Sequence, residues 1–297
     1  MEKRVVALGF FDGVHIGHAE LLKRTAASAA ASGATASVMT FDIHPDTLVF
    51  GRPAPLINSP KDREQIIGKL FGIDDVIFLH FNEQLMKMPW EEFISSFVSE
   101  LNITGLVVGH DFTFGHNGEG NPARLREYCD KNGLTLDVIP PVYLNGVLVS
   151  STYIRALIEK GDMDSARSFL GHPHFVSDYV HSGYRLGTQM GMPTINMFFR
   201  PGVIVPAFGV YASKTEIDGV SYKSVTNIGV RPTVSDEKNV NIETHLLGYS
   251  GNLYGKEVKL EFYRHLRDEK KFSSTQELFA QIRKDAEETE KYFAVNG

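Results

Sequence analysis

Hydrophobic positions in the first half of the chain occur in short, nearly continuous runs separated by longer amphipathic ones. Short apolar runs are typical of buried strands, whereas apolar residues that recur every three or four positions indicate helices. The strands expected are residues 4–8, 35–41, 75–81, 105–109 and 134–139. The helices expected are residues 19–32, 90–101, 122–132, 152–160 and 162–170. Strands that alternate with helices predict an α/β fold with a doubly wound parallel sheet and right-handed crossovers.

A different pattern begins near residue 176 and continues to residue 263, where short segments alternate between apolar and polar positions and glycines are frequent. Within it, Asp218 and Gly219 separate two such segments, and this dipeptide is a strong signal for a two-residue hairpin turn. The region therefore predicts an antiparallel β-barrel. Ser274 and Glu277 then form a capping box, and the apolar stripe that follows predicts a C-terminal helix docked on the barrel.

Composition agrees with two domains. The chain has 297 residues, 42% hydrophobic and 22% charged, enough to bury two ordinary cores, which we assign to residues 1–171 and 172–297. The net charge of −6 argues against a nucleic-acid partner, because such binding requires a basic surface. A single cysteine, Cys129, excludes a disulfide framework and favours a reducing, cytoplasmic location. No apolar run reaches the length of a membrane-spanning helix, so no membrane association is expected.

Two glycines and two histidines follow the first predicted strand. Gly13 and Gly17 allow the backbone to approach a ligand closely, and the next helix directs its N-terminal N–H groups and positive dipole end toward the same place. His15 and His18 are three positions apart, so both imidazoles can donate hydrogen bonds to phosphate oxygens. This arrangement predicts a nucleotide phosphate site. Its expected binding residues are Gly9, Phe11, Asp12, Gly13 and Gly17.

The spacing of His15 and His18 also fits one half of a metal site. A closed zinc site needs further ligands, and the chain offers one cysteine. The order of strand, loop and helix favours an anion instead, so nucleotide binding is the stronger interpretation.

Residues 11–18 have the form Phe-Asp-Gly-Val-His-x-Gly-His. The His-x-Gly-His core resembles the signature of the nucleotidyltransferase superfamily, and the full run resembles the bacterial FAD synthetases. Two later runs resemble the same family: residues 109–115, with Gly-x-Asp-Phe-x-Phe-Gly, and residues 150–155, with Ser-Ser-Thr-x-Ile-Arg. The resemblance implies a nucleotidyltransferase-type fold for the first domain.

The same resemblance implies roles for individual side chains. Paired histidines would stabilise charge at the α-phosphate of ATP, an arginine and two hydroxyls would hold the triphosphate, and an aspartate and a phenylalanine would line the flavin pocket. The paired histidines are His15 and His18, the residues for the triphosphate are Arg155, Ser151 and Thr152, and the residues for the flavin pocket are Asp111 and Phe112. His44 is a further flavin-binding candidate, because it follows the carboxyl end of a predicted strand, where open α/β sheets bind ligands.

The predicted barrel carries a second group of candidate residues. Gly183, Gly187 and Gly191 are four positions apart, which by itself is weak evidence for a phosphate loop. Thr194 and Asn196 follow in a Pro-Thr-x-Asn run, where a hydroxyl and an amide oxygen can help to hold Mg²⁺ and nucleotide phosphates.

These runs resemble the riboflavin kinase module, as do the Glu-Thr-His run that begins at Glu243 and the Leu-Arg pair that ends at Arg267. The resemblance implies that Glu243 is the general base on the 5′-hydroxyl of riboflavin and that Arg267 binds flavin. One departure is notable: Leu186 and Thr188 stand where the family's glycine loop is basic. The loss of two charge-assisted contacts predicts weakened ATP binding in the barrel.

Together the motifs predict a bifunctional flavin enzyme with riboflavin, FMN, FAD and ATP as ligands. ATP phosphorylates riboflavin to FMN in the barrel, and a second ATP adenylylates FMN to FAD in the first domain, with Mg²⁺ bridging phosphates. Two alternatives stay open: a monofunctional FMN adenylyltransferase with a kinase-impaired, flavin-binding barrel, and a non-catalytic flavin-binding regulator. An adenylyltransferase for pantetheine phosphate or nicotinamide mononucleotide would share the histidine motif but gives no reason for the second domain. No oligomeric state is predicted.

Overall fold

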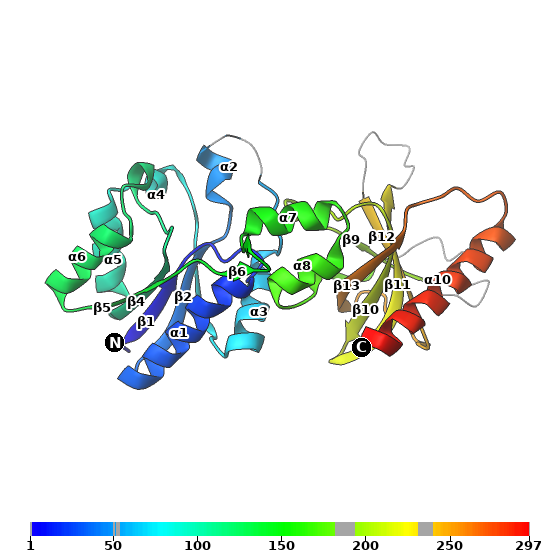
Figure 1. Ribbon diagram of the computed structural model, residues 1–297, viewed down its shortest axis with the longest axis horizontal. Coiled ribbons are helices and arrows are strands. Elements are labelled where there is room, and N and C mark those ends of the chain that lie inside the picture. Colours follow the sequence, from blue (N-terminus) through cyan, green and yellow to red (C-terminus); the bar gives the residue numbers. More distant parts are fainter. Residues whose placement is uncertain (1, 50, 52–53, 182–193, 231–239, 297) are drawn as a thin grey trace. The chain divides into compact units, whose positions relative to one another are not determined.

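A computed structural model describes residues 2–49, 51, 54–181, 194–230 and 240–296 (Figure 1). Its internal contacts divide the chain into two compact units. The first comprises Met1–Leu56 and Pro60–Ser151, and the second comprises Ile57–Ser59 and Thr152–Gly297. The sequence-based domain boundary at residue 171 stays a prediction.

The first unit is built around a five-stranded parallel sheet. Its strands are β1 (Arg4–Leu8), β2 (Thr35–Phe41), β3 (Asp75–Leu79), β4 (Ile103–Gly109) and β5 (Thr135–Ile139). They lie in the order β3-β2-β1-β4-β5, and every neighbouring pair is parallel. The predicted doubly wound sheet is therefore confirmed, with its topological switch point at the carboxyl ends of β1 and β4.

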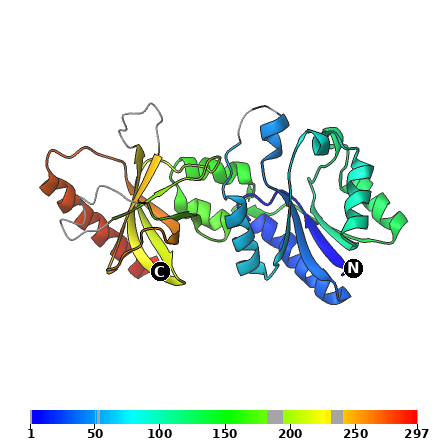
Figure 2. The ribbon, with the colours of Figure 1, turned by 180° about the vertical axis from the view of Figure 1, so that it is seen from behind.

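Helices cover both faces of this sheet (Figures 1 and 2). They are α1 (Ile16–Ser32), α2 (Pro45–Val49), α3 (Pro60–Phe71), α4 (Glu83–Lys87), α5 (Trp90–Glu100) and α6 (Pro122–Asn132). Val6 and Leu8 of β1 pack with Phe93 of α5 and Leu125 of α6 in one apolar cluster, whereas α1 and α3 lie on the opposite face. A 3₁₀ turn (His116–Gly118) and a short hairpin of β6 (Tyr143–Leu144) and β7 (Val147–Leu148) complete the unit.

The second unit holds an antiparallel sheet of six strands. They are β8 (His174–Tyr179), β9 (Thr194–Phe198), β10 (Gly209–Ile217), β11 (Val220–Val230), β12 (Val240–Leu246) and β13 (Glu257–Arg267), in the order β8-β13-β10-β11-β12-β9. The sheet curls until its edge strands approach each other, where the His181 amide donates to the Asn196 carbonyl at 2.9 Å. The antiparallel, barrel-like fold expected from the sequence is thus confirmed as a curled half-barrel.

The described part of the second unit also has the helices α7 (Ser151–Glu159), α8 (Met163–Leu170) and the C-terminal α10 (Thr275–Asn296). The predicted hairpin turn lies between β10 and β11, with Asp218 at φ 49° and Gly219 at φ 82°. One of the two hydrogen bonds of the predicted capping box is present, because Ser274 Oγ accepts from the Glu277 amide at 3.2 Å. The Glu277 carboxylate accepts at 3.0 Å from the amide of Ser273, one residue before the expected partner.

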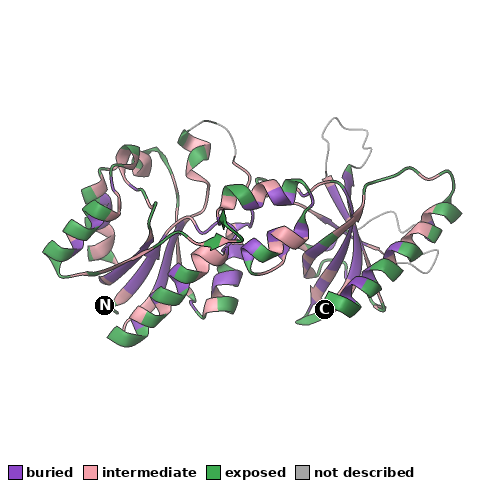
Figure 3. Cartoon of the chain, in the orientation of Figure 1, coloured by how far each residue is buried: buried purple, intermediate pink, exposed green. Residues whose placement is uncertain are grey.

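Buried residues follow the strands of both sheets (Figure 3). Among the buried residues of the barrel strands are five serines and threonines that contact one another: Ser213, Thr215, Ser224, Thr226 and Thr244, each 0% exposed. Their oxygens form one connected hydrogen-bonded chain with spacings of 2.7 to 2.9 Å. Each hydroxyl can donate and accept, so these five side chains satisfy one another inside the barrel.

Candidate functional site

The loop after β1 has a strained backbone. Phe11 (φ 54°), Gly13 (φ 80°) and Val14 (φ 40°) all adopt left-handed conformations, which are unfavourable for phenylalanine and valine. Such strain persists only when the surrounding structure holds it. Here Phe11 is 0% and Val14 1% exposed, so apolar packing is one of the forces that hold the loop.

Hydrogen bonds from distant segments also hold this loop. Ser151 Oγ donates to the Asp12 carbonyl at 2.9 Å, and Arg63 Nη1 donates to the Phe10 carbonyl at 2.8 Å. Asp12 is itself buried. The structure therefore brings Ser151 to the predicted phosphate loop, where it contacts the backbone.

The two histidines of the motif lie at the start of α1. His15 is the N-cap residue, and its Nδ1 accepts from the His18 amide at 3.2 Å. The two rings stack with centroids 3.6 Å apart and planes 11° apart. A Cβ at Gly17 would lie 3.1 Å from two atoms of the His15 ring, which explains the glycine at this position. The structure thus brings the two imidazoles together at a helix N-terminus, and their action on a phosphate stays a prediction.

The surroundings of His18 keep its imidazole uncharged at neutral pH. Burial lowers the pKa of His18 well below its usual value, and the neighbouring His15 and Arg63 lower that pKa further. Among the described residues, Nδ1 of His18 has no hydrogen-bond partner although it is buried. A neutral imidazole can donate one hydrogen bond and accept another.

Other predicted residues of the nucleotide site have less defined surroundings. A Cβ at Gly9 would lie 3.0 Å from the Phe11 ring, so glycine is needed there for packing. Thr152 and Arg155 lie in α7 and belong to the second unit, whereas the histidine pair belongs to the first. Their contribution to triphosphate binding stays a prediction.

The flavin candidates of the first unit follow the carboxyl ends of strands. His44 follows β2, and its ring contacts the Phe10 ring edge to face with centroids 4.6 Å apart. Asp111 follows β4 and is exposed, whereas the Phe112 ring stacks on Phe114 at 5.3 Å and packs against the apolar cluster of α5 and α6. All three residues therefore lie beyond the carboxyl ends of the strands, where open α/β sheets bind ligands, and contact with flavin stays a prediction.

In the barrel, Glu243 lies at the centre of a polar row. Glu243 lies on β12, opposite Asn196 of the neighbouring strand β9 and opposite Asn227 of the other neighbour, β11. Asn241, two positions earlier on β12, donates from Nδ2 to Glu243 Oε1 at 3.1 Å and to Asn196 Oδ1 at 3.3 Å. Asn196 and Asn241 are each 4% exposed, so the row lies mostly away from solvent.

This row fits the donor chemistry of Mg²⁺. The cation prefers oxygen ligands and is commonly held by one or two protein groups together with substrate phosphates. Asn241 Oδ1 is buried and has no partner among the described residues, and the amide of Asn196 lies beside it. Thr194 adds a hydroxyl two positions before Asn196 on β9. The described residues contain no group of three His, Cys, Asp or Glu side chains that could bind a metal by themselves.

Arg267 has a structural task. Its Nη2 and Nε donate to the Asp285 carboxylate at 2.8 and 3.1 Å, and its Nη1 donates to the Asp268 carbonyl at 3.1 Å. Asp285 is 2% exposed. The pair ties β13 to α10, and the predicted contact of Arg267 with flavin is untested.

The remaining barrel candidates lie outside the described residues. They are the three glycines of the barrel's predicted glycine loop and the two residues at its usually basic positions: Gly183, Gly187, Gly191, Leu186 and Thr188.

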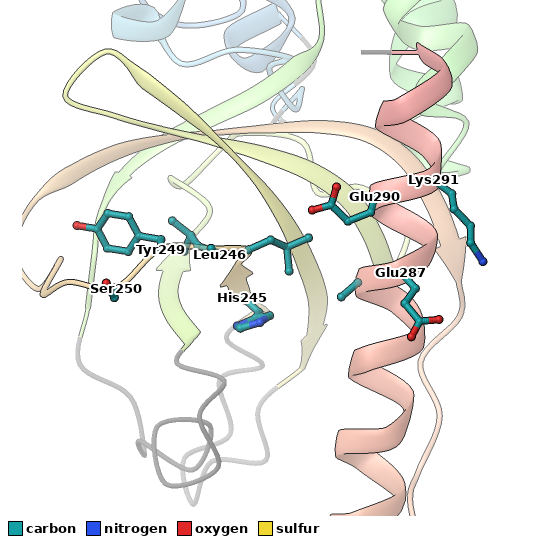
Figure 4. A pocket seen from close by; sticks show the side chains of 10 residues that line it. His245, Leu246, Tyr249, Ser250, Glu287, Glu290 and Lys291 are labelled. Carbon is teal, nitrogen blue, oxygen red and sulfur yellow. The ribbon is translucent and has the colours of Figure 1, made fainter.

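An open surface pocket of about 840 Å³, called a cavity below, lies between the end of β12 and α10 (Figure 4). His245 and Tyr249 line it from the strand side, and Ala286, Glu287 and Glu290 line it from α10. His245 and Glu243 are two positions apart on one strand, so their side chains lie on the same face of the sheet.

Three residues of these two sites are not indicated by any sequence motif: Arg63 and Thr40 behind the loop, and Asn241 beside Glu243. Arg63 and Asn241 resemble ordinary surface polar residues in the sequence. The only available signal for Asn241 is its period-two spacing from Glu243, which places both side chains on one strand face. No described helix is long and apolar enough to cross a membrane.

A parallel sheet with this strand order, a glycine-containing turn after its first strand and a histidine-capped helix define a nucleotide-binding α/β domain. The family model described as FAD synthetase matches residues 1–153, and the model described as riboflavin kinase matches residues 170–293. The chain therefore belongs to the family of bifunctional riboflavin kinase/FMN adenylyltransferases.

Individual relatives are similar to this chain over nearly its whole length. A bifunctional riboflavin kinase/FMN adenylyltransferase of Bacillus subtilis (strain 168) is 36% identical over 298 residues, covering 98% of this chain and 93% of that protein. The protein of the same name from Pseudomonas fluorescens is 34% identical over 282 residues, covering 95% and 90%. A crystal structure described as a macrolide-efflux protein from Streptococcus pneumoniae superposes with a TM-score of 0.86 at 29% identity, covering 97% and 94%.

Proposed function

We propose that this chain makes FAD from riboflavin in two ATP-dependent steps. The barrel transfers the γ-phosphoryl group of ATP to the 5′-hydroxyl of riboflavin, giving FMN and ADP. The α/β unit transfers AMP from a second ATP to the FMN phosphate, giving FAD and pyrophosphate. The observation that carries the proposal is the match to bifunctional relatives over 98% of the chain, which spans both units.

In adenylyl transfer, an oxygen of the FMN phosphate attacks the α-phosphorus of ATP, and the bond to pyrophosphate breaks. Negative charge builds up on the α-phosphate oxygens, so donors directed at them accelerate the step. We assign this task to His15, His18 and the N-terminal amides of α1. We assign the departing pyrophosphate to Ser151, Thr152 and Arg155, whose hydroxyl and guanidinium donors suit phosphate. No covalent intermediate with the protein is required.

In the kinase step, the 5′-hydroxyl of riboflavin must lose its proton as it attacks the γ-phosphorus. Glu243 is the assigned base, because a carboxylate within reach of the hydroxyl can accept that proton. Thr194, Asn196 and Asn241 would hold Mg²⁺, which neutralises charge on the ATP phosphates when it is bound.

We further assign the riboflavin ring to the cavity between β12 and α10. Its volume of about 840 Å³ lies in the range of small-molecule sites, and His245 at its wall shares a strand face with Glu243. An Ala286→Phe substitution should fill part of this cavity and raise the KM for riboflavin, with FAD formation from FMN unchanged. Ala280→Phe, at an exposed position of the same helix, is the matched control.

The main test follows flavins separated after incubation with ATP and Mg²⁺. We expect wild type to convert FMN to FAD and riboflavin to FMN. His18→Ala should slow only the first conversion, and Glu243→Gln only the second. Absence of FMN from riboflavin would leave a monofunctional adenylyltransferase, the outcome suggested by Leu186 and Thr188.

Small-molecule substrates and a cytoplasmic location complete the proposal. The substrates rest on the family, the net charge of −6 argues against a nucleic-acid partner, and the single cysteine favours the cytoplasm.

A further inference from the structure

One arginine lies against the phosphate loop and belongs to no motif. Arg63 projects from α3 and is 0% exposed, an unusual position for a guanidinium. Its Nη1 lies 2.8 Å from the Phe10 carbonyl, 3.0 Å from Thr40 Oγ1 and 3.0 Å from the Phe41 carbonyl. The arginine therefore joins the ends of β1 and β2 to the first residues of the loop.

The Phe10 carbonyl receives a second hydrogen bond from the same cluster. Thr40 Oγ1 donates to it at 2.7 Å, and the Arg63 guanidinium also lies over the Phe10 ring, 4.6 Å from its centroid. Both the backbone and the side chain of Phe10 are thus held by Arg63. The next residue, Phe11, is the first of the strained residues at positive φ, so this contact acts where the loop departs from the strand.

The other two nitrogens of the guanidinium, Nε and Nη2, are also buried. Among the described residues, neither Nε nor Nη2 of Arg63 has a hydrogen-bond acceptor. Burial lowers the pKa of Arg63 to about 10, against the attraction of Asp12 and Asp42, so the group remains charged at neutral pH. A buried charge that is only partly compensated is costly, and such a cost is expected where the charge serves a site.

The groups that act on His18 come from two sides. The His15 ring stacks on it from the same helix, and Arg63 acts from α3. Asp12 of the loop and Asp42 after β2 attract Arg63 and so moderate its effect. Phe11, 5.1 Å from His18 between ring centroids, is apolar.

We propose that Arg63 is a positioning residue of the adenylyltransferase site, which fixes the Phe10 carbonyl and places a buried positive charge behind the loop that leads to His15 and His18. The inference rests on the proposed function for its effect on FAD formation. Two consequences follow. The loop keeps one shape before ATP arrives, and the field at the loop favours an incoming polyphosphate. The charge of Arg63 also adds to the effects of burial and of His15, which lower the pKa of His18.

The test compares four variants of the full chain. Arg63→Gln removes the charge and the three-oxygen contact, Arg63→Lys keeps the charge but cannot span the three oxygens, and Thr40→Val removes one hydroxyl. Lys69→Gln removes a positive charge from an exposed position of α3 and serves as the control. FAD formation from FMN, riboflavin phosphorylation and the NMR titration of the His18 ring are measured for each.

We expect Arg63→Gln to reduce kcat/KM for FAD formation on the order of 10- to 100-fold, with riboflavin phosphorylation unchanged and the His18 titration moved to higher pH. Arg63→Lys and Thr40→Val should reduce FAD formation less and leave the titration in place. If Arg63→Gln does not fold, a wild-type rate in Arg63→Lys overturns the inference.

Three further results would also overturn it: a wild-type rate of FAD formation in Arg63→Gln, an equal loss of both activities, or an unmoved His18 titration. Failure of wild type to form FAD would refute the proposed function instead, since the titration would still report whether Arg63 acts on His18.

Discussion

His174 should make the stability of the barrel depend on pH. This first residue of β8 is 1% exposed, its ring stacks on Phe262 with centroids 5.8 Å apart, and neither ring nitrogen has a hydrogen-bond partner among the described residues. Burial, with a smaller effect from His172, lowers the pKa of His174 to about 3. The folded protein therefore holds this imidazole neutral across the range in which an unfolded chain binds a proton.

The sign and size of the effect follow from linkage. The pKa of His174 is lower in the folded chain, so below about pH 6.5 the unfolded chain binds a proton that the folded chain does not. Stability is then lost as the pH falls from about 6.5 toward 3. A pH of 5 lies about 1.5 units below the pKa of His174 in the unfolded chain, which corresponds to about 2 kcal/mol of lost stability relative to pH 7.5.

The assay is urea unfolding of wild type and His174→Phe at pH 7.5 and pH 5.0. Far-UV circular dichroism reports on both units, whereas the fluorescence of Trp90, the single tryptophan, reports on the first unit alone. We expect His174→Phe to retain the stacking on Phe262 and to lose about 2 kcal/mol less than wild type on acidification. His181→Phe, at a side chain that is 46% exposed, is the control. Equal losses in wild type and His174→Phe would refute the reasoning.

Three further changes have defined outcomes. Gly17→Ala places a Cβ 3.1 Å from the His15 ring, so the ring must shift. FAD formation should then fall about tenfold, whereas riboflavin phosphorylation should continue; equal rates of FAD formation in wild type and variant would exclude a role for the stacked pair. Asp285→Asn breaks the buried pair with Arg267 and should destabilise the second unit by about 3–5 kcal/mol, measured from the urea unfolding midpoint. A loss below about 1 kcal/mol, which is what surface pairs contribute, would show that the pair is not needed for docking of α10. Gly219→Ala forces alanine to φ 82° and should cost about 1 kcal/mol, with an unchanged melting temperature as the contrary result.

The sheets could be predicted from the sequence because their signals are local. The first two strands, β1 and β2, have the bounds that their apolar runs indicate, since buried parallel strands are almost continuously hydrophobic. The hairpin at Asp218 and Gly219 follows from two residues that accept positive φ. The hydrophobic pattern did not predict helix α3, because two residues of its buried face, Asp62 and Arg63, are charged. A hydrophobic pattern assigns such residues to solvent.

Roles within the sites were harder to predict than positions. The motif alone places His15 and His18 together at a helix start, because their spacing is that of one helical turn. Arg267 shows the opposite case, since its main partner Asp285 is 18 residues away and a motif does not reveal which donors are already engaged. A residue that matches a family motif can therefore be held by its own protein rather than by a ligand.

The phosphate loop shows why a motif is not sufficient to make a site. The two residues on either side of the strained Phe11 are held from far along the chain: Phe10 by Arg63 and Thr40, 53 and 30 residues away, and Asp12 by Ser151, 139 residues away. Each contact requires the completed sheet, because the three partners come from separate segments of the fold. A chain with the same eight-residue motif but without these donors would keep the histidine cap, which forms within one turn of helix, and would lose the shape of the loop before it. The cap is encoded locally, whereas the shape of the loop depends on tertiary structure.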